Sequence, residues 1–421
     1  MRRRRSRGPR NAPFKWLAIL LLIVLVGYVA YRELGFGVKV DSGTQGPVIR
    51  IDVPTVELSL PSSVAIQATQ PPARAQPTVP PGPAGAPAPA PSQAPGGWYD
   101  IYFTTPRYPD KPEYHHGGID TQLVAFINSA QKTLDIAIYD FDLENVANAL
   151  AQAAARGVRV RMVTDTDTLT NDDPKVQRAF DILKQANIPI VDDQRPAIMH
   201  DKFVVVDNQA IWTGSWNFTD GDTYHLNNNA IKIVSPELAH NYTAEFEKMF
   251  VQRRFGPAKP AGGTEANVTL HSVRIENYFA PKDKVAAKIV ARVEQAQQSI
   301  HFLAFSFTSD TIGQSIIARA KAGVSVMGVF EKTGSETQYS EYGKMRRAKL
   351  DVLQDGNPYV KHHKVIIIDG RTVIFGSFNF TNNADRDNDE NLLIVDDPTL
   401  ANAFEAEFQR VREVALNPPT K

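Results

Sequence analysis

The sequence predicts an α/β fold of two duplicated α/β sandwich halves related by a pseudo-twofold axis, preceded by an N-terminal transmembrane helix and a disordered linker. A repeat is the first observation behind this: HDKFVVVDNQAIWTGSWN at 200–217 returns as HHKVIIIDGRTVIFGSFN at 362–379. A second, gapless match pairs residues 130–141 with 296–307. The third observation is an uncharged apolar run, followed by a Pro/Ala-rich stretch, before residue 98.

The first 32 residues carry eight basic groups and no acidic group. Residues 1–15 form a basic segment, which we expect to stay in the cytoplasm, and residues 16–32 form a transmembrane signal anchor. The uncharged part of the anchor would span roughly 24 Å as a helix, slightly short of the ~30 Å hydrocarbon core, with flanking basic side chains able to snorkel. We therefore expect a single-pass membrane protein with its catalytic part outside the cytoplasm. A cleaved signal peptide and secretion are the alternative.

Residues 33–97 are predicted to form a linker. Its part from 71 to 95 is rich in Pro and Ala and lacks helical or strand periodicity, which is typical of an extended spacer. Residues 48–66 show some alternation that could support a lone strand, but we favour disorder there as well.

Charge and cysteine content exclude several classes of protein. After residue 32 the chain holds 38 basic and 46 acidic residues, a net charge of −8, which is not the footprint of a tight non-specific nucleic-acid binder. The chain contains no cysteine, so disulfides and thiolate metal sites are excluded.

The two predicted domains, 98–254 and 265–415, share one order of elements. Each half contains a helix, a strand, a helix, a glycine turn, a second strand and then a hairpin, and Gly157 corresponds to Gly323 in this order. Alternating strands and helices predict an α/β sandwich in each half. Because both copies of the repeat lie in one chain, we expect a monomer with one site between its halves.

Both copies of the repeat obey one spacing: His, any residue, Lys, four residues, Asp, six residues, then Gly-Ser-any-Asn. The apolar residues after each Lys predict a buried strand, and the Asp opens a turn that leads into a second strand. The spacing therefore gives two matched sets: His200, Lys202, Asp207, Gly214, Ser215 and Asn217, and His362, Lys364, Asp369, Gly376, Ser377 and Asn379.

The chemistry of these residue types suits a phosphate group. If the first turn is centred between Asn208 and Gln209, Lys202 lies opposite Ser215 at the open end of the hairpin. An imidazole, an ammonium, a hydroxyl and an amide then face one place, where they can bind a phosphate. Asp207 lies roughly 17 Å further along the strand, at about 3.3 Å per residue, so we assign it and its counterpart Asp369 to the turns.

The paired motif resembles the signature of the phospholipase D superfamily, and the resemblance covers about residues 100–412. It implies that one histidine attacks phosphorus to give a phosphohistidine, while the other protonates the leaving oxygen and then activates water. A phosphodiester requires such a nucleophile and acid, and cations for its developing charge, which Lys202 and Lys364 supply. No metal or other cofactor is expected in this scheme.

The resemblance also implies an acidic partner for a histidine ring. Glu390 follows His362 by the distance at which Asn228 follows His200. A carboxylate beside His362 would favour its imidazolium form, whereas an amide beside His200 would not, so we predict His200 as nucleophile and His362 as acid. Swapped roles remain an alternative, because a different residue near Asn228 can serve in its place: Asp220, Asp222 or His225.

Other polar clusters have an ordinary structural interpretation. The run from Asp165 to Thr168 resembles the first motif of haloacid dehalogenase-type phosphatases but is more simply a loop at a strand end. His115 and His116 are a conceivable metal-ligand pair, but no partner spacing supports one. The basic residues of 344–349 could steer an anion, although a solvated helix face is the simpler interpretation.

The sequence thus indicates a phosphodiesterase acting by hydrolysis or transfer, with phospholipid head groups as the favoured substrate and the membrane as a partner. A metal-independent nuclease of the same superfamily is the alternative. A degenerate binding domain is disfavoured, because the His, Lys, Ser and Asn residues are intact in both halves.

Overall fold

The computed structural model describes residues 37–43, 46–52, 92–93 and 97–419. The predicted basic segment and signal anchor, residues 1–32, lie outside these ranges, as does most of the predicted linker. No helix within the described ranges is long and apolar enough to cross a bilayer. The chain forms two compact units, Met1–Pro81 and Gly82–Lys421.

The first unit contains an antiparallel hairpin of β1 (Gly37–Gly43) and β2 (Gly46–Asp52), in which Gly37 pairs with Asp52 and Gly43 with Gly46. The prediction of a disordered linker is therefore wrong for these residues. β1 contains two Val residues, and β2 contains one Val and two Ile, which favour extended backbone. Each strand supplies the hydrogen-bonding partner that a lone strand lacks.

The second unit contains two eight-stranded sheets with the same strand order. In both, parallel strands lie at one side and antiparallel strands at the other. The first sheet has the order β3-β4-β10-β9-β8-β5-β6-β7: β3 (Ser92–Gln93), β4 (Tyr99–Phe103), β5 (Thr133–Ile138), β6 (Arg159–Thr164), β7 (Ile190–Asp192), β8 (Lys202–Val206), β9 (Ala210–Gly214) and β10 (Asn229–Val234). The second has the order β11-β12-β18-β17-β16-β13-β14-β15: β11 (Asn267–Leu270), β12 (Val273–Ala280), β13 (Ser299–Ala304), β14 (Ser325–Phe330), β15 (Asp351–Gln354), β16 (Lys364–Ile368), β17 (Thr372–Gly376) and β18 (Glu390–Asp396).

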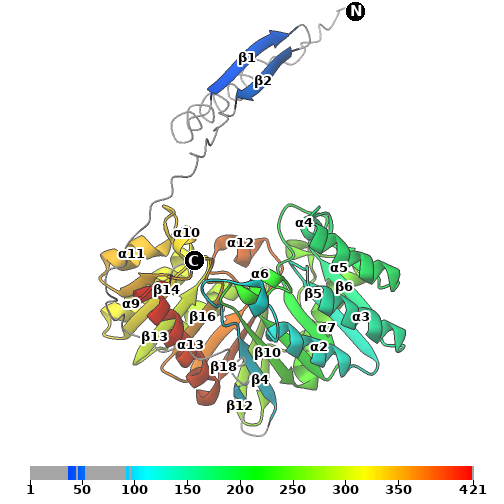
Figure 1. Ribbon diagram of the computed structural model, residues 1–421. Coiled ribbons are helices and arrows are strands. Elements are labelled where there is room, and N and C mark those ends of the chain that lie inside the picture. The colour runs from blue at the N-terminus through cyan, green and yellow to red at the C-terminus, as the bar shows by residue number, and fades with distance from the viewer. Residues whose placement is uncertain (1–36, 44–45, 53–91, 94–96, 420–421) are drawn as a thin grey trace, which may run out of the picture. The chain divides into compact units, whose positions relative to one another are not determined.

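Helices follow the same repeat, as Figure 1 shows for the cyan-to-green and yellow-to-red halves. The first half contains η1 (Pro112–Tyr114), α2 (Ile119–Asn128), α3 (Glu144–Ala155), α4 (Thr166–Leu169), α5 (Pro174–Gln185), α6 (Asp220–Tyr224) and α7 (Pro236–Phe250). After η2 (Gly256–Ala258), the second contains α8 (Val285–Val293), α9 (Asp310–Lys321), α10 (Lys332–Ser335), α11 (Glu341–Arg347), α12 (Asn382–Arg386) and α13 (Pro398–Leu416).

The two halves share one apolar core. Its members come from the inner faces of both sheets and from α7 and α13, including Phe203, Tyr242, Phe375 and Phe404. Two further cores lie on the outer faces, under α2, α3 and α5 in the first half and under α8, α9 and α11 in the second. Because both faces of each sheet are covered, the central strands are apolar throughout instead of alternating.

The predicted duplication and order of elements are confirmed. Gly157 and Gly323 end equivalent helix turns with φ values of 90° and 96°, a region that glycine adopts without the steric cost of a Cβ. The duplicated strand order carries the two His-Lys strands, β8 and β16, to equivalent central places in their sheets.

The predicted hairpin register is wrong by one residue. Phe203 pairs with Thr213 and Val206 with Ala210, so the first turn contains three residues and Lys202 does not lie opposite Ser215. Asp207 and Asn208 both have φ 54°, and the Asp207 carboxylate accepts hydrogen bonds from the backbone N–H groups of residues 131–133. These contacts to a neighbouring strand fix the turn, and the hairpin sequence alone does not reveal them.

Candidate active site

The two histidines lie at the boundary between the halves, where the backbones of the two halves are hydrogen-bonded to each other. His200 N donates to Asp389 O at 2.9 Å, and His362 N donates to Asn227 O at the same distance. Each histidine is thus fixed by backbone of the opposite half, in the reciprocal manner that twofold symmetry requires. The side chains of His200 and His362 are almost fully buried, with 6% and 8% of their surface exposed.

His200 is held by a carboxylate of the second half. Its Nδ1 lies 2.8 Å from Oε2 of Glu390, and Ser377 Oγ donates to the same oxygen at 2.7 Å. Burial raises the pKa of Glu390 to about 8. Burial and the ammonium groups of Lys202 and Lys364 hold the pKa of His200 well below its usual value. This low pKa favours the neutral imidazole.

His362 is held by two side chains of the first half. Its Nδ1 lies 2.9 Å from Oδ1 of Asn228 and 3.3 Å from Oδ1 of Asp222. Burial raises the pKa of Asp222, but its contacts with His362, the N–H of Asn217 and the charge of Lys202 together leave the pKa below its ordinary value. Burial and Lys364 lower the pKa of His362 itself to about 3 in the site without an anion.

The pairing inferred from the sequence is thus reversed. We expected Glu390 beside His362 and Asn228 beside His200, but each lies beside the histidine of the other half. The physical reason is a pair of backbone bridges between the halves, in which Met199 pairs with Asp389 and Asn227 pairs with Lys361. Asp222 then supplies His362 with a carboxylate; Ala384 takes the equivalent place in the second half. Asp222 is a site residue that the motif spacing does not single out.

The two lysines begin strands β8 and β16 and are buried beside their histidines. Lys202 Nζ donates to His200 O at 2.8 Å, and Lys364 Nζ donates to His362 O at 2.7 Å. Burial lowers the pKa of Lys202 to about 8, and burial together with Lys202 lowers that of Lys364 well below its usual value. A nearby anion would favour the charged form of both lysines.

An aromatic ring covers each His-Lys pair. Tyr139 lies 5.0 Å from the ring of His200 and 5.1 Å from Nζ of Lys202. Phe305, at the equivalent place, lies 4.7 Å from both the ring of His362 and Nζ of Lys364. These rings exclude water from one side of the site. The sequence did not identify these two rings as part of the site, although the alignment of residues 130–141 with 296–307 pairs Tyr139 with Phe305.

The glycine of each repeat allows two strands to approach closely, and the serine donates a hydrogen bond to the side chain that contacts a histidine. A Cβ on Gly214 would collide with the backbone of Asn229, because β9 and β10 approach closely there, and Gly376 meets Asn391 in the same way. Ser215 Oγ donates to Asn228 Oδ1 at 2.8 Å, as Ser377 does to Glu390. Both hydroxyl hydrogens are therefore already donated to the partners of the histidines, and direct phosphate binding by the serines stays a prediction.

The asparagines of the repeats lie at the edge of the site. Asn217 Nδ2 is 3.3 Å from Oδ1 of Asp222, while Oδ1 of Asn217 is buried without a hydrogen-bond partner. Asn379 also has an unpartnered Oδ1 and lines a cavity of about 660 Å³ whose walls are mostly hydroxyl and amide side chains. Their role in phosphate binding stays a prediction.

Asp207 and Asp369 do not contact this site. Asp369 accepts the backbone N–H groups of Gln297, Gln298 and Ser299, as Asp207 does at the equivalent turn. Asp165 caps α4 and accepts the N–H of Met199 at 2.9 Å, so it supports the residue before His200.

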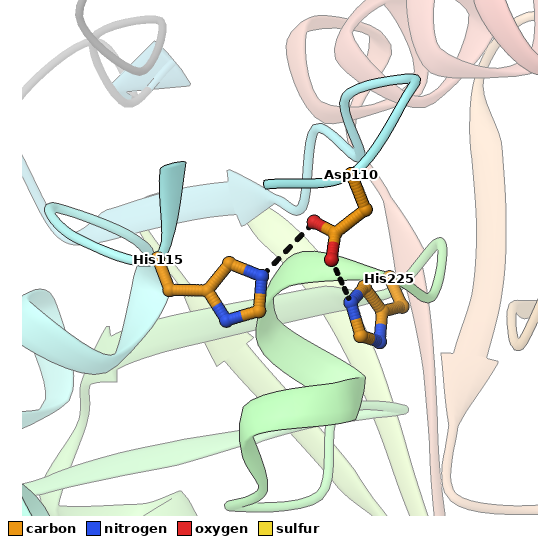
Figure 2. A group of neighbouring side chains, drawn as sticks. All are labelled: Asp110, His115 and His225. Atoms are coloured by element: carbon orange, nitrogen blue, oxygen red, sulfur yellow. Dashed lines mark hydrogen bonds and ion pairs between the residues drawn. The ribbon is translucent and has the colours of Figure 1, made fainter. Parts of the chain in front are cut away.

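One group of His and acidic side chains in the described part of the chain could hold a metal ion, and it is not the paired histidines. Its members are Asp110, His115 and His225 (Figure 2). The sequence suggested His116 as the second metal ligand beside His115, but in the structure Asp110 and His225 lie beside His115 instead.

Each of the two halves matches a known domain family. Residues 123–250 and 289–412 match the domain family described as "Cardiolipin synthase, PLD-like domain". The chain is 34% identical over 130 residues to "Phospholipase D" of Rickettsia prowazekii (strain Madrid E), covering 31% of this chain and 63% of the relative. It is 29% identical over 131 residues to "Mitochondrial cardiolipin hydrolase" of Xenopus laevis, covering 31% of this chain and 62% of the relative. The chain thus spans just under two thirds of the length of these two relatives.

A solved structure resembles most of the chain. It is the phosphatidylserine synthase of Haemophilus influenzae Rd KW20, at 13% identity and a TM-score of 0.56. The match covers 75% of this chain and 86% of that one. At this identity the likeness concerns the fold.

Proposed function

This chain belongs to the family of phospholipase D-like domains, and we propose that it is a phosphodiesterase that works through a phosphohistidine at His200, with phospholipids as substrates. The observation that carries the proposal is the exchange of partners between the halves. Nδ1 of His200 lies against Glu390, and Nδ1 of His362 lies against Asn228 and Asp222. Both histidines therefore keep Nε2 for a phosphorus centre and its leaving group.

The two carboxyl groups support different roles for the two histidines. Glu390 has a raised pKa and so does little to favour an imidazolium at His200, which suits a neutral nucleophile. Asp222 has a lowered pKa and remains a carboxylate beside His362, where it stabilises an imidazolium. A bound phosphodiester anion opposite Lys202 and Lys364 raises the pKa of His362 from its low value, because it offsets the two ammonium charges.

The proposed reaction has two balanced steps. Nε2 of His200 attacks phosphorus and forms a P–N bond while the P–O bond to the leaving alcohol breaks, and His362 gives its proton to that oxygen. His362 then takes a proton from water, whose oxygen attacks phosphorus and releases His200. An alcohol in place of water gives transfer instead of hydrolysis. Lys202 and Lys364 stabilise the negative charge on the phosphoryl oxygens throughout.

Phospholipids are the favoured substrate class for two reasons. The relatives named above are a phospholipase D and a cardiolipin hydrolase, and both names concern lipids. The chain also carries a predicted membrane anchor at residues 16–32 and a net negative charge after it, which favours a lipid surface over free nucleic acid as the site of action.

The experiment compares two substrates with one protein. The full chain, purified in detergent, is supplied with phosphatidylglycerol or cardiolipin vesicles and, in parallel, with single-stranded DNA. We expect head-group release from lipid, no shortening of DNA, and loss of release in His200→Ala. DNA cleavage without lipid turnover would replace the phospholipase by a nuclease, and turnover that survives His200→Ala would refute the phosphohistidine scheme.

A further inference from the structure

A group of three metal-ligating side chains joins two separate parts of the first half. Asp110 and His115 come from the segment between β4 and α2, and His225 directly follows α6 (Figure 2). Nε2 of His115 lies 2.9 Å from Oδ1 of Asp110, and Nε2 of His225 lies 3.0 Å from Oδ2. The three ligand atoms all lie within 4.8 Å of one another.

A neutral His115 cannot satisfy both of its carboxylate neighbours, so this group needs either a proton or a metal ion. His115 faces a carboxylate oxygen at each ring nitrogen, Asp110 at Nε2 and Asp220 at Nδ1, the latter at 3.1 Å. A neutral imidazole has a single N–H, so one nitrogen directs a lone pair at an anion. Nε2 of His225 is buried and makes no hydrogen bond of acceptable geometry, despite its short distance from Asp110. Both features indicate that a cation is needed between these atoms.

We propose that Asp110, His115 and His225 bind a divalent transition-metal ion of the Zn²⁺ class. Tetrahedral Zn²⁺ with bonds of about 2.1 Å separates neighbouring ligand atoms by about 3.4 Å. Asp110 contacts His115 through Oδ1 at 2.9 Å and His225 through Oδ2 at 3.0 Å, and one ligand atom from each residue lies within 4.8 Å of the others, so the side chains must shift to share one ion. Two imidazoles and one carboxylate suit Zn²⁺ better than Mg²⁺ or Ca²⁺, which prefer oxygen ligands. The three side chains are 19–24% exposed, which leaves a fourth position for water.

The surroundings of the site are those of a supported metal centre. Asp220 accepts the Nδ1–H of His115, the usual outer contact of a ligating histidine, and this leaves the lone pair of Nε2 for the ion. Tyr224 stacks on His115 with ring centres 4.6 Å apart, and Tyr359 stacks on His225 at 4.3 Å. These contacts fix both ring planes before an ion enters.

The ion would have a structural role and would take no part in the reaction at phosphorus. α6 carries Asp222, which contacts His362, and His225 closes the same short helix. An ion at His225 therefore ties α6 to the 110–115 segment and holds Asp222 in place. This role is independent of the substrate proposed above.

Zn²⁺ alone is the probe for the test. The full chain is stripped with a chelator, and Zn²⁺ is added while the heat of binding and the unfolding temperature are followed. We expect one ion per chain and a higher unfolding temperature. His225→Gln and Asp110→Asn should each weaken binding at least about 100-fold, while Asp220→Asn should weaken it less, by about 10- to 100-fold. His116→Gln, which changes an exposed neighbour, is the matched control and should bind like the parent protein.

Co²⁺ supplies a spectroscopic readout that misfolding cannot imitate. The Co²⁺ form should show the visible absorption of a four-coordinate ion, and His225→Gln should lose it while its circular dichroism stays unchanged. Absence of stoichiometric Zn²⁺ binding, or equal weakening by His116→Gln, would overturn the proposal. In that case a protonated His115 would satisfy both carboxylates, and Zn²⁺ would leave the unfolding temperature unchanged.

Discussion

Oε2 of Glu390 lies 2.8 Å from Nδ1 of His200, although the two residues belong to different halves of the duplicated chain. The equivalent contact, between Asn228 and His362, lacks a carboxylate, and Asp222 supplies one from a neighbouring helix. The site is therefore symmetric in its backbone and asymmetric in its charges. In the mechanism that we propose, that asymmetry lets one histidine attack and the other carry a proton.

The leaving group should distinguish the two histidines. Bis(p-nitrophenyl) phosphate releases a stable phenolate that needs no proton, so His362→Ala should still release a first equivalent of p-nitrophenol. The same variant should be inactive on an alkyl phosphodiester, whose leaving alkoxide requires an acid. His200→Ala should release neither product. The measurement is a stopped-flow burst, and a burst in His200→Ala but not in His362→Ala would reverse the roles.

Asp222→Asn should slow cleavage of alkyl phosphodiesters by about 10²- to 10⁴-fold, the usual contribution of a supported general acid. The amide keeps the shape of the carboxylate but removes the charge that stabilises imidazolium at His362. The loss should be much smaller with p-nitrophenyl esters. Asp172→Asn, at an exposed position of the same half, is the control for a simple change in net charge. Equal losses with both leaving groups would contradict this role.

Lys259 should contribute strongly to stability, because it neutralises acids at the junction of the halves. Its buried Nζ pairs with Glu245 and lies 2.6 Å from Asp389. Lys259→Met leaves these carboxylates without that partner and should lower the free energy of unfolding by about 3 kcal/mol. Urea unfolding measures this, with the exposed Lys282→Met as control. Equal midpoints for the two variants would show that the pairs are not needed.

Asp201 should make stability depend on pH. Burial raises the pKa of this carboxyl from 3.8 to about 7 in the folded chain, so the unfolded chain loses its proton first as pH rises. Asp201 therefore costs increasing stability from about pH 4 to about pH 7, and the cost is constant above that. Asp201→Asn keeps an oxygen for the hydrogen bond from Asn391 and cannot ionise.

The unfolding temperature of Asp201→Asn should equal that of the parent near pH 4. Its advantage should grow up to about pH 7 and then level off, because the parent carboxyl is by then ionised in both states. An advantage that is constant with pH would contradict the raised pKa.

Much of this architecture could be predicted from the sequence. The repeat and its offset gave the duplication, and the apolar runs after Lys202 and Lys364 gave the two central strands. These features are local in the sequence or repeated in it, so they can be recognised without knowing how the chain packs. The hairpin turn at Asp207 was missed by one residue because its φ values are fixed by N–H groups more than seventy residues earlier in the chain.

The contacts between the halves could not be predicted in the same way. The spacing places Glu390 and His362 in the same repeat. In the structure, backbone hydrogen bonds from His200 to Asp389 and from His362 to Asn227 join the halves, so each histidine contacts side chains of the other repeat. The sequence offered Asp222 only as one of three residues that could stand in for Asn228 beside His200, but its carboxylate lies beside His362. The second half has Ala384 at the equivalent position, so a comparison of the two copies does not select it. Asp110 and His225 are likewise more than a hundred residues apart in sequence.

The most direct test of the account is to trap the intermediate. The His362→Ala variant of the full chain is mixed with bis(p-nitrophenyl) phosphate, quenched in alkali, which preserves phosphohistidine, and mapped by peptide mass spectrometry. We expect a p-nitrophenylphosphoryl group on His200, formed in step with the burst of p-nitrophenol. A burst without any labelled histidine, or a label on another residue, would contradict it.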